Sequence, residues 1–138
     1  ERLGRREPLH LFRRNLPAAA VLVMDIDTLR RYCLSFPQAT EGMQWGDNLL
    51  FRVAGKIFAI VSLDSTPLRL AFKCTPAEFA ELIEREGIVP APYMARNHWV
   101  SLEGLNVLPR ADIKRLIHDS YHMIAAKLPK KVKSELGL

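Results

Sequence analysis

The pattern of apolar and polar positions begins to repeat just after Met24. Apolar residues recur there at helical spacing, at Ile26, Leu29, Cys33 and Phe36. This spacing predicts an amphipathic first helix with one buried stripe. Asp25 or Asp27 can cap its start, and Pro37 is expected to end it.

The pattern then changes to the two-residue period of β-strands. Segments 49–53 and 56–61 flank Ala54-Gly55, a dipeptide suited to a tight turn, which predicts a β-hairpin. A second turn is expected at 64–67, and the alternating segment 68–73 reads as the next strand. These elements predict a β-meander with one buried face.

A second helix has an unusually complete start signal. Thr75 is placed to act as N-cap, Pro76 occupies the first helical position, and Glu78 can close a capping box. Phe79, Leu82 and Ile83 would form its buried stripe. Gly87 is expected to end this helix.

The chain is predicted to finish with a strand over 97–102, a helix over about 109–127 and a polar lysine-rich tail. The helix has a single apolar stripe, formed by Ile113, Leu116, Ile117, Tyr121, Ile124 and Leu128. Three or four consecutive strands with tight turns predict an α+β fold. We expect an antiparallel sheet, a meander plus a later strand, with helices packed on one face. The other face would be open to solvent or covered by a partner.

Composition narrows the class of protein. A length of 138 residues, with 49% hydrophobic and 25% charged side chains, is typical of one globular domain. Two cysteines are too few for a disulfide framework, which favours a reducing cytoplasm. No apolar run approaches the roughly 18 residues of a membrane helix, so no membrane partner is expected.

The net charge of +5 is concentrated near the N-terminus, where residues 1–23 carry five arginines against two glutamates. This segment has no sustained amphipathic period, so we assign 1–23 to an extension and 24–138 to the single domain. A targeting signal is less favoured than a translated upstream stretch or a variable extension, because the apolar run is brief. The domain itself is nearly neutral, so a basic patch would require charges sorted onto one face.

Strand alternation predicts such sorting. Arg52, Arg69 and Lys73 should point away from their apolar neighbours, onto the outward face of the sheet. Lys56, in the same predicted hairpin as Arg52, completes this set of candidate cations. Beyond the sheet, segment 93–100 gathers aromatic and polar groups in one short stretch, and we include four of its residues in the candidate site: Arg96, Asn97, His98 and Trp99.

The two tryptophans admit three interpretations. Burial in the core is the favoured one for both Trp45 and Trp99, because aromatic side chains contribute most when buried. Alternatively, an exposed ring could stack on nucleobases, or anchor a protein partner. The first interpretation leaves the other candidates without an aromatic platform.

No set of residues points to catalysis or to a metal. His118 and His122 have the i, i+4 spacing of a zinc pair, but the sequence places no third ligand. Cys33 falls on the buried stripe of the first helix. Cys74 precedes a helix start, which can activate a thiol, but no base is placed beside it. We therefore expect no enzyme activity, no cofactor and no metal.

A series of short motifs shares a characteristic order and spacing: Phe36-Pro37, Trp45-Gly46, Phe51-Arg52-Val53, Gly55-Lys56-Ile57-Phe58-Ala59, Leu70-Ala71-Phe72-Lys73, Tyr93, Asn97-His98-Trp99-Val100 and Ser120-Tyr121. Together they resemble the MmcQ/YjbR family of small bacterial proteins over about residues 24–130. The resemblance implies a frataxin-like (CyaY-like) fold, and family members are commonly labelled DNA-binding. Frataxins use an acidic ridge to handle iron, whereas the first helix here pairs Asp25 and Asp27 with two arginines, which disfavours iron delivery.

We therefore expect a non-enzymatic cytoplasmic binding domain. The leading hypothesis is weak, sequence-independent binding of DNA or RNA through the open sheet face and the 96–99 corner. The alternative is a protein-interaction or small-ligand module that uses the same corner. Salt dependence distinguishes phosphate contacts from an apolar interface.

Overall fold

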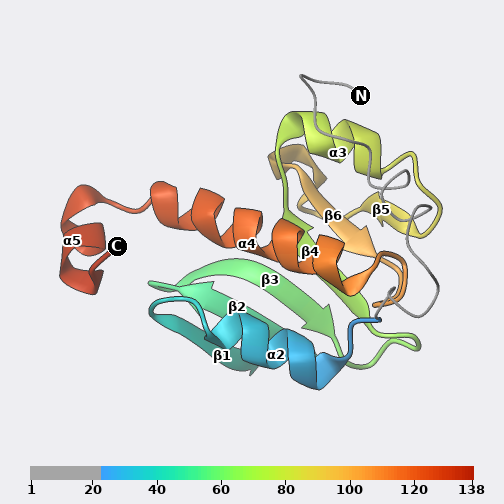
Figure 1. The fold of residues 1–138 in the computed structure, drawn as a ribbon, viewed down its shortest axis with the longest axis horizontal. Coiled ribbons are helices and arrows are strands. Elements are labelled where there is room, and N and C mark those ends of the chain that lie inside the picture. The colour runs from blue at the N-terminus through green and yellow to red at the C-terminus, as the bar shows by residue number, and fades with distance from the viewer. Residues whose placement is uncertain (1–22) are drawn as a thin grey trace.

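The computed structural model describes residues 23–138, so the predicted extension lies outside the described residues except for Val23. Within this range the chain forms an α+β fold with one six-stranded antiparallel sheet of strand order β1-β2-β3-β4-β6-β5 (Figure 1). The strands are β1 (Ala39–Gln44), β2 (Asn48–Val53), β3 (Lys56–Ser62), β4 (Arg69–Lys73), β5 (Ile88–Pro90) and β6 (Trp99–Leu102). The helices are α2 (Ile26–Leu34), α3 (Pro76–Leu82), α4 (Arg110–Ala126), α5 (Lys130–Leu136) and the 3₁₀ turn η2 (Ala95–Asn97).

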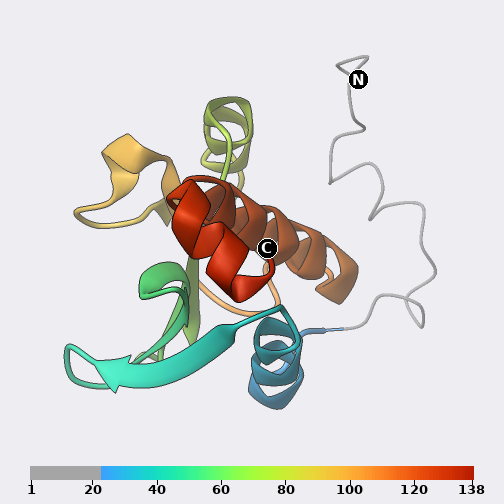
Figure 2. The same cartoon turned by 90° about the vertical axis from the view of Figure 1, so that its left-hand side faces the viewer.

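The helices α2, α3 and α4 pack on one face of the sheet, as the sequence predicts. The long helix α4 crosses β2, β3 and β4, while α2 packs beside β1 and α3 beside β5 and β6 (Figure 1). Figure 2 shows this layer from the end, with α5 turning back beyond the end of α4. The α+β class is therefore confirmed, and the frataxin-like detail stays a prediction.

The main core lies between this helix layer and the sheet. Phe51, Phe58 and Phe72 enter it from three neighbouring strands and are fully buried. A β-bulge places both Phe58 and Ala59 on the helix side, because Phe51 pairs with Ala59 whereas Arg52 pairs with Ile57. Ile57 and Ile60, which flank this pair in β3, therefore face the opposite side of the sheet.

One buried hydroxyl fastens α4 to the sheet. Ser120 donates a hydrogen bond to the carbonyl of Phe58 at 2.7 Å and accepts one from the amide of Lys73 at 3.0 Å. Close by, Tyr121 donates to the carbonyl of Pro37 at 2.6 Å and stacks on Phe36. The helix is thus held by directional bonds as well as by apolar burial.

The starts of the first two helices follow the predicted capping chemistry. Asp25 accepts a hydrogen bond from the amide of Thr28 at 2.8 Å, and Thr75 accepts one from the amide of Glu78 at 3.1 Å. Pro76 occupies the first turn, where its missing N–H costs nothing. In the hairpin between β2 and β3, Ala54 and Gly55 both adopt the positive φ that a tight turn requires.

The end of α3, the role of Gly87 and the start of β6 differ from the sequence prediction. Helix α3 ends at Leu82 rather than Gly87, because the chain tightens into turns at once, with Arg85 donating to the carbonyl of Leu82 at 3.0 Å. Gly87 has a positive φ and lies against the Val107 side chain, so its role is a close approach and not a cap. The predicted 97–102 strand begins only at Trp99, since the preceding residues form η2.

Three other segments have structure that the sequence pattern did not indicate, and the first of them is the edge strand β1, which is mostly exposed. The proline-rich stretch after Gly87 contains the edge strand β5, which tolerates Pro90 because it pairs on one side only. The lysine-rich tail forms the short helix α5. No helix within residues 23–138 is long and apolar enough to cross a membrane.

The outward face of the sheet is not fully open. A second, smaller apolar cluster lies on it, made of Leu50, Ile60, Ala91 and Trp99, with Ile57, Ala71 and Met94 packed against them. Part of this cluster comes from the 91–98 segment, which folds back over the strands. The chain itself therefore covers part of the face that we expected to be open.

Candidate functional site

A groove beside this second cluster is the best-formed candidate site, and we call it the outer groove. Its volume of about 650 Å³ lies within the range of about 300–1,000 Å³ that is usual for small-molecule sites. Strand residues form its floor, and the β1–β2 turn and the 91–94 segment form its sides. The lining residues are Trp45, Asn48, Ile60, Ser62, Arg69, Ala71, Ala91, Pro92, Tyr93, Met94 and Ser101.

Two exposed aromatic side chains border the outer groove. Trp45 is 64% exposed and Tyr93 is fully exposed, at 104% of the reference area. Both residues have a left-handed backbone, with φ of 54° and 65°. That conformation costs a bulky side chain on the order of 1–3 kcal/mol, and such strained residues cluster at functional sites. Both exposed rings therefore belong to residues with a strained backbone.

Hydrogen bonds hold the Trp45 side of the groove in place. The Asn48 amide donates to the carbonyl of Trp45 at 2.8 Å, and the Ser62 hydroxyl donates to the Asn48 side-chain oxygen at 3.0 Å. The Leu63 amide also donates to the carbonyl of Asp47 in the same turn at 2.8 Å. The turn is therefore fixed to β3, and the position of Trp45 is largely set before any ligand arrives.

The Tyr93 side is fixed by backbone bonds. Ala91 donates to the carbonyl of Trp99 at 3.0 Å, and the Trp99 amide donates to the carbonyl of Met94 at 3.3 Å. These bonds fold the 91–94 segment against β6. Between the two sides, the small side chains of Ala71 and Ser101 leave room above the sheet.

Arg69 brings the single charged side chain among the eleven lining residues. Its guanidinium lies 3.7 Å from the Glu103 carboxylate, and both side chains are more than 40% exposed. Exposed ion pairs of this kind contribute little, at most about 1 kcal/mol. Arg69 can therefore exchange this partner for an anionic group in the groove at small cost.

The predicted cations do not form one continuous patch. Arg52, Arg69 and Lys73 do share the outward face, because their strand neighbours Phe51, Leu70 and Phe72 lie in the main core. The second apolar cluster lies on the same face, however. Arg52 is bonded to the Gln44 side chain, and Lys73 donates to the carbonyl of Asn97 at 2.7 Å.

Lys56 does not join the other three cations. It pairs with Val53, a core residue, so it projects from the helix-covered side at the exposed end of the hairpin.

Burial lowers the pKa of Lys73, and the nearby charge of Lys127 lowers it further. The outward face therefore carries separated cations around an apolar centre.

The 96–99 corner is only partly a surface. Arg96 and Asn97 are exposed, and His98 has a left-handed backbone with its ring against Phe79. Trp99 is only 5% exposed and belongs to the second apolar cluster. An exposed stacking role for Trp99 is therefore wrong, and its burial in a core is confirmed.

Trp45 shows the opposite outcome, since we favoured the core and the ring is exposed. The sequence offered one signal, Gly46 directly after it, which is typical of a tight turn. The sequence marks Tyr93 as part of an aromatic segment and of the family motifs, but gives it no separate role. Asn48, Ser62 and Ser101 carried no recognisable signal, because only the sheet register brings them together.

The cysteines are unsuited to nucleophilic chemistry. Cys33 and Cys74 are both buried, and burial raises the pKa of each thiol to about 12. Cys74 also lies against the carbonyl of His98, at 3.3 Å from its sulfur. The rings of His118 and His122 on α4 lie 4.3 Å apart and are tilted by 55°, and within residues 23–138 no three potential metal ligands are grouped.

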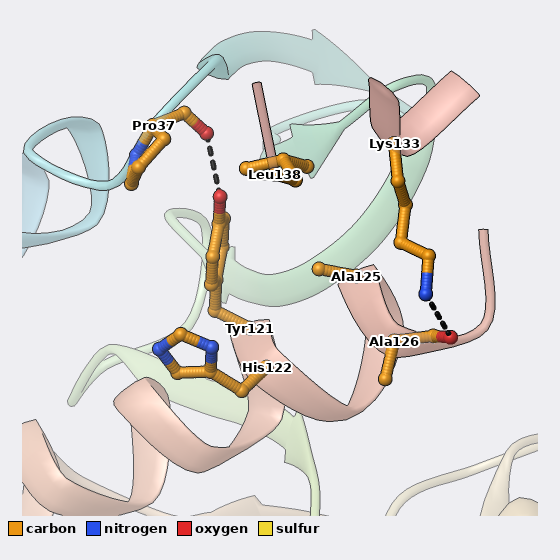
Figure 3. Close-up of a pocket in the computed structure, with 7 residues that line it drawn as sticks. All are labelled: Pro37, Tyr121, His122, Ala125, Ala126, Lys133 and Leu138. Atoms are coloured by element: carbon orange, nitrogen blue, oxygen red, sulfur yellow. Dashed lines mark hydrogen bonds between the residues drawn. The ribbon is translucent and has the colours of Figure 1, made fainter. Parts of the chain in front are cut away.

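A smaller cavity of about 250 Å³ lies between α4 and the C-terminal segment (Figure 3). Leu138 and Lys133 close it from one side, and Tyr121 and Pro37 from the other. The Lys133 ammonium donates to the carbonyl of Ala126 at 3.3 Å. Lys133 and Leu138 thus form part of the wall of this cavity.

Comparisons with known proteins place this fold among relatives. The YjbR family model matches residues 34–123. The crystal structure of DR2400 from Deinococcus radiodurans, described as a DUF419 domain, is 27% identical with a TM-score of 0.76, over 84% of this chain and 90% of that one. A Pseudomonas syringae protein is 21% identical with a TM-score of 0.61, over 72% of this chain and 98% of that one, and shows the fold alone. No curated protein matches.

Proposed function

The chain belongs to the YjbR family, and we propose that it is a non-enzymatic binding domain that holds a small, mostly apolar organic molecule in the outer groove. One observation carries this proposal. A concave space of about 650 Å³ is bordered by two exposed aromatic residues, both with a left-handed backbone. Concave apolar surfaces with a few polar groups are the usual form of a ligand site.

The lining chemistry supports binding rather than catalysis. None of the eleven lining residues is a cysteine, histidine or carboxylate, the groups that most often act as nucleophile or general base. Ser62 lines the groove, but its hydroxyl proton is donated to Asn48. Trp45, Tyr93 and Arg69 belong to residue types that dominate protein contacts as well, but the concave shape favours a small ligand over a protein surface.

A fragment screen by ligand-observed NMR tests the proposal. Ala71→Leu places a larger side chain on the groove floor, and its matched control, Ala80→Leu, makes the same change on the exposed side of α3. We expect fragments that bind the parent and Ala80→Leu but lose most of their signal with Ala71→Leu. A screen without hits, or hits that ignore Ala71→Leu, would remove the groove from consideration.

Nucleic-acid binding is a second candidate, supported by the shared face of Arg52, Arg69 and Lys73. Replacing all three with alanine should weaken DNA or RNA binding and flatten its log–log salt slope by up to about 0.9 per lost DNA phosphate contact. Fluorescence anisotropy with a labelled oligonucleotide, measured across a salt series, gives this slope. An unchanged slope in a folded triple variant contradicts this candidate.

A further inference from the structure

We infer that the ligand of the outer groove is a planar aromatic molecule carrying one anionic group, which Arg69 binds. This inference rests on the proposed function and specifies the class of ligand. Three observations carry it: the aromatic borders, the single charge in the lining, and the hydrogen bonds that already engage Asn48 and Ser62 within the protein.

The borders and floor favour a flat ring. Trp45 and Tyr93 offer exposed aromatic faces on the two sides of the groove, and aromatic pairs gain from stacked or edge-on contact beyond simple burial. Ile60 and Ala71 supply an apolar floor from adjacent strands, where they are direct partners in the register. A sheet surface bearing small side chains is shallow and even, which suits a planar molecule better than a bulky one.

The charge in the lining selects an anion. Arg69 is the one charged side chain among the eleven lining residues, and Glu103 lies outside that set. The backbone of Arg69 is held in place, because its amide donates to the Ser65 hydroxyl at 3.1 Å. A guanidinium binds a carboxylate or phosphate through two parallel N–H donors, which fixes the orientation of the group as well as its charge.

Two of the neutral polar side chains in the lining, Asn48 and Ser62, are already bonded within the protein, which gives little support to a heavily hydroxylated ligand such as a sugar. The Ser62 hydroxyl donates to the Asn48 side-chain oxygen, and the Asn48 amide donates to the carbonyl of Trp45, so both side chains already have hydrogen-bond partners within the protein. Their effect is to position the Trp45 turn. Recognition is therefore assigned to the two rings and the guanidinium.

A matched pair of probes tests the inference: 2-naphthoate and 2-naphthamide share one ring system and differ in charge. Affinities are measured by titration NMR at low salt. We expect naphthoate to bind about threefold to tenfold more tightly than naphthamide, since the ion pair is partly screened by solvent. Arg69→Gln should abolish this preference while leaving naphthamide affinity nearly unchanged.

Two charge variants separate a specific contact from the general field of the protein. Glu103→Gln removes the competing carboxylate and should raise naphthoate affinity about twofold to fivefold. Lys56→Gln, at the far end of the hairpin, removes the same charge as Arg69→Gln and should change naphthoate affinity little. Equal losses in Lys56→Gln and Arg69→Gln would overturn the assignment to Arg69.

The outcomes distinguish this inference from the proposed function. If both probes bind equally well and Ala71→Leu weakens both, the groove binds ligands but the anionic group is wrong. If neither probe binds and the fragment screen is also empty, the proposed function fails.

The anionic ring has two possible sources, a free molecule or a nucleotide strand. Competition of naphthoate by thymidine monophosphate and by single-stranded oligothymidylate identifies the source, since a strand alone would add a steep salt dependence.

Discussion

Replacing Ser120 with alanine should lower the free energy of unfolding by about 2–4 kcal/mol. Ser120 is fully buried, and its hydroxyl joins α4 to two central strands through bonds of 2.7 and 3.0 Å. Alanine would leave the Phe58 carbonyl and the Lys73 amide without this partner. A buried polar group that loses its partner costs about 1–3 kcal/mol. The better helix propensity of alanine returns only about 0.5 kcal/mol.

Urea unfolding followed by far-UV circular dichroism measures this loss. Ser35→Ala is the matched control, because Ser35 is exposed and donates to the carbonyl of Tyr32 only one turn away. We expect the control to remain within about 0.5 kcal/mol of the parent. A Ser120→Ala loss no larger than that of the control would refute the claim that this hydroxyl fastens the helix to the sheet.

Two further predictions concern the helix α3 and an exposed ion pair. Thr75→Ala removes the hydroxyl that accepts the hydrogen bond of the Glu78 amide and caps α3, so it should lower the free energy of unfolding by about 0.5–2 kcal/mol. Thermal unfolding measures this loss, and an unchanged melting temperature would mean that the cap contributes nothing. Arg30 bonds to Glu41 and lowers the pKa of that carboxyl below its ordinary 4.5. The pair therefore stabilises the fold above that value and loses its effect as pH falls through the lowered pKa. Glu41→Gln should flatten the fall in stability below about pH 4.5, and an equally steep fall would contradict this.

The sequence predicted the elements whose signal is local. Apolar stripes located α2 and α4, and capping chemistry located the starts of α2 and α3. The edge strands carried weaker signals. β1 contains Gly42 and polar side chains and is mostly exposed, so it shows no apolar alternation, while β5 has three residues and ends in proline. Both exist because a neighbouring strand pairs with them, which no local pattern records.

The candidate site was harder to predict for a related reason. Strand alternation correctly placed Arg52, Arg69 and Lys73 on one face, since a side-chain period of two is a local property. The burial of Trp99 depends instead on where the 91–94 segment folds back, and Trp45 is exposed in the turn between β1 and β2. The sequence therefore predicted the face but not the groove, because the groove is lined by residues more than forty positions apart, such as Trp45 and Tyr93.

The division of apolar residues between the two faces of the sheet has a consequence for variation within the fold. Phe58 and Val61 of β3 belong to the main core, while Ile60 between them belongs to the cluster beneath the outer groove. Residues that maintain stability and residues that shape the groove therefore alternate along the same strand. Substitutions at Ile60, Ala71 or Ser101 can reshape the space offered to a ligand while the packing under α4 is left intact. The sheet thus lets ligand preference diverge between relatives that keep one scaffold, and it gives protein engineers a face on which to alter selectivity.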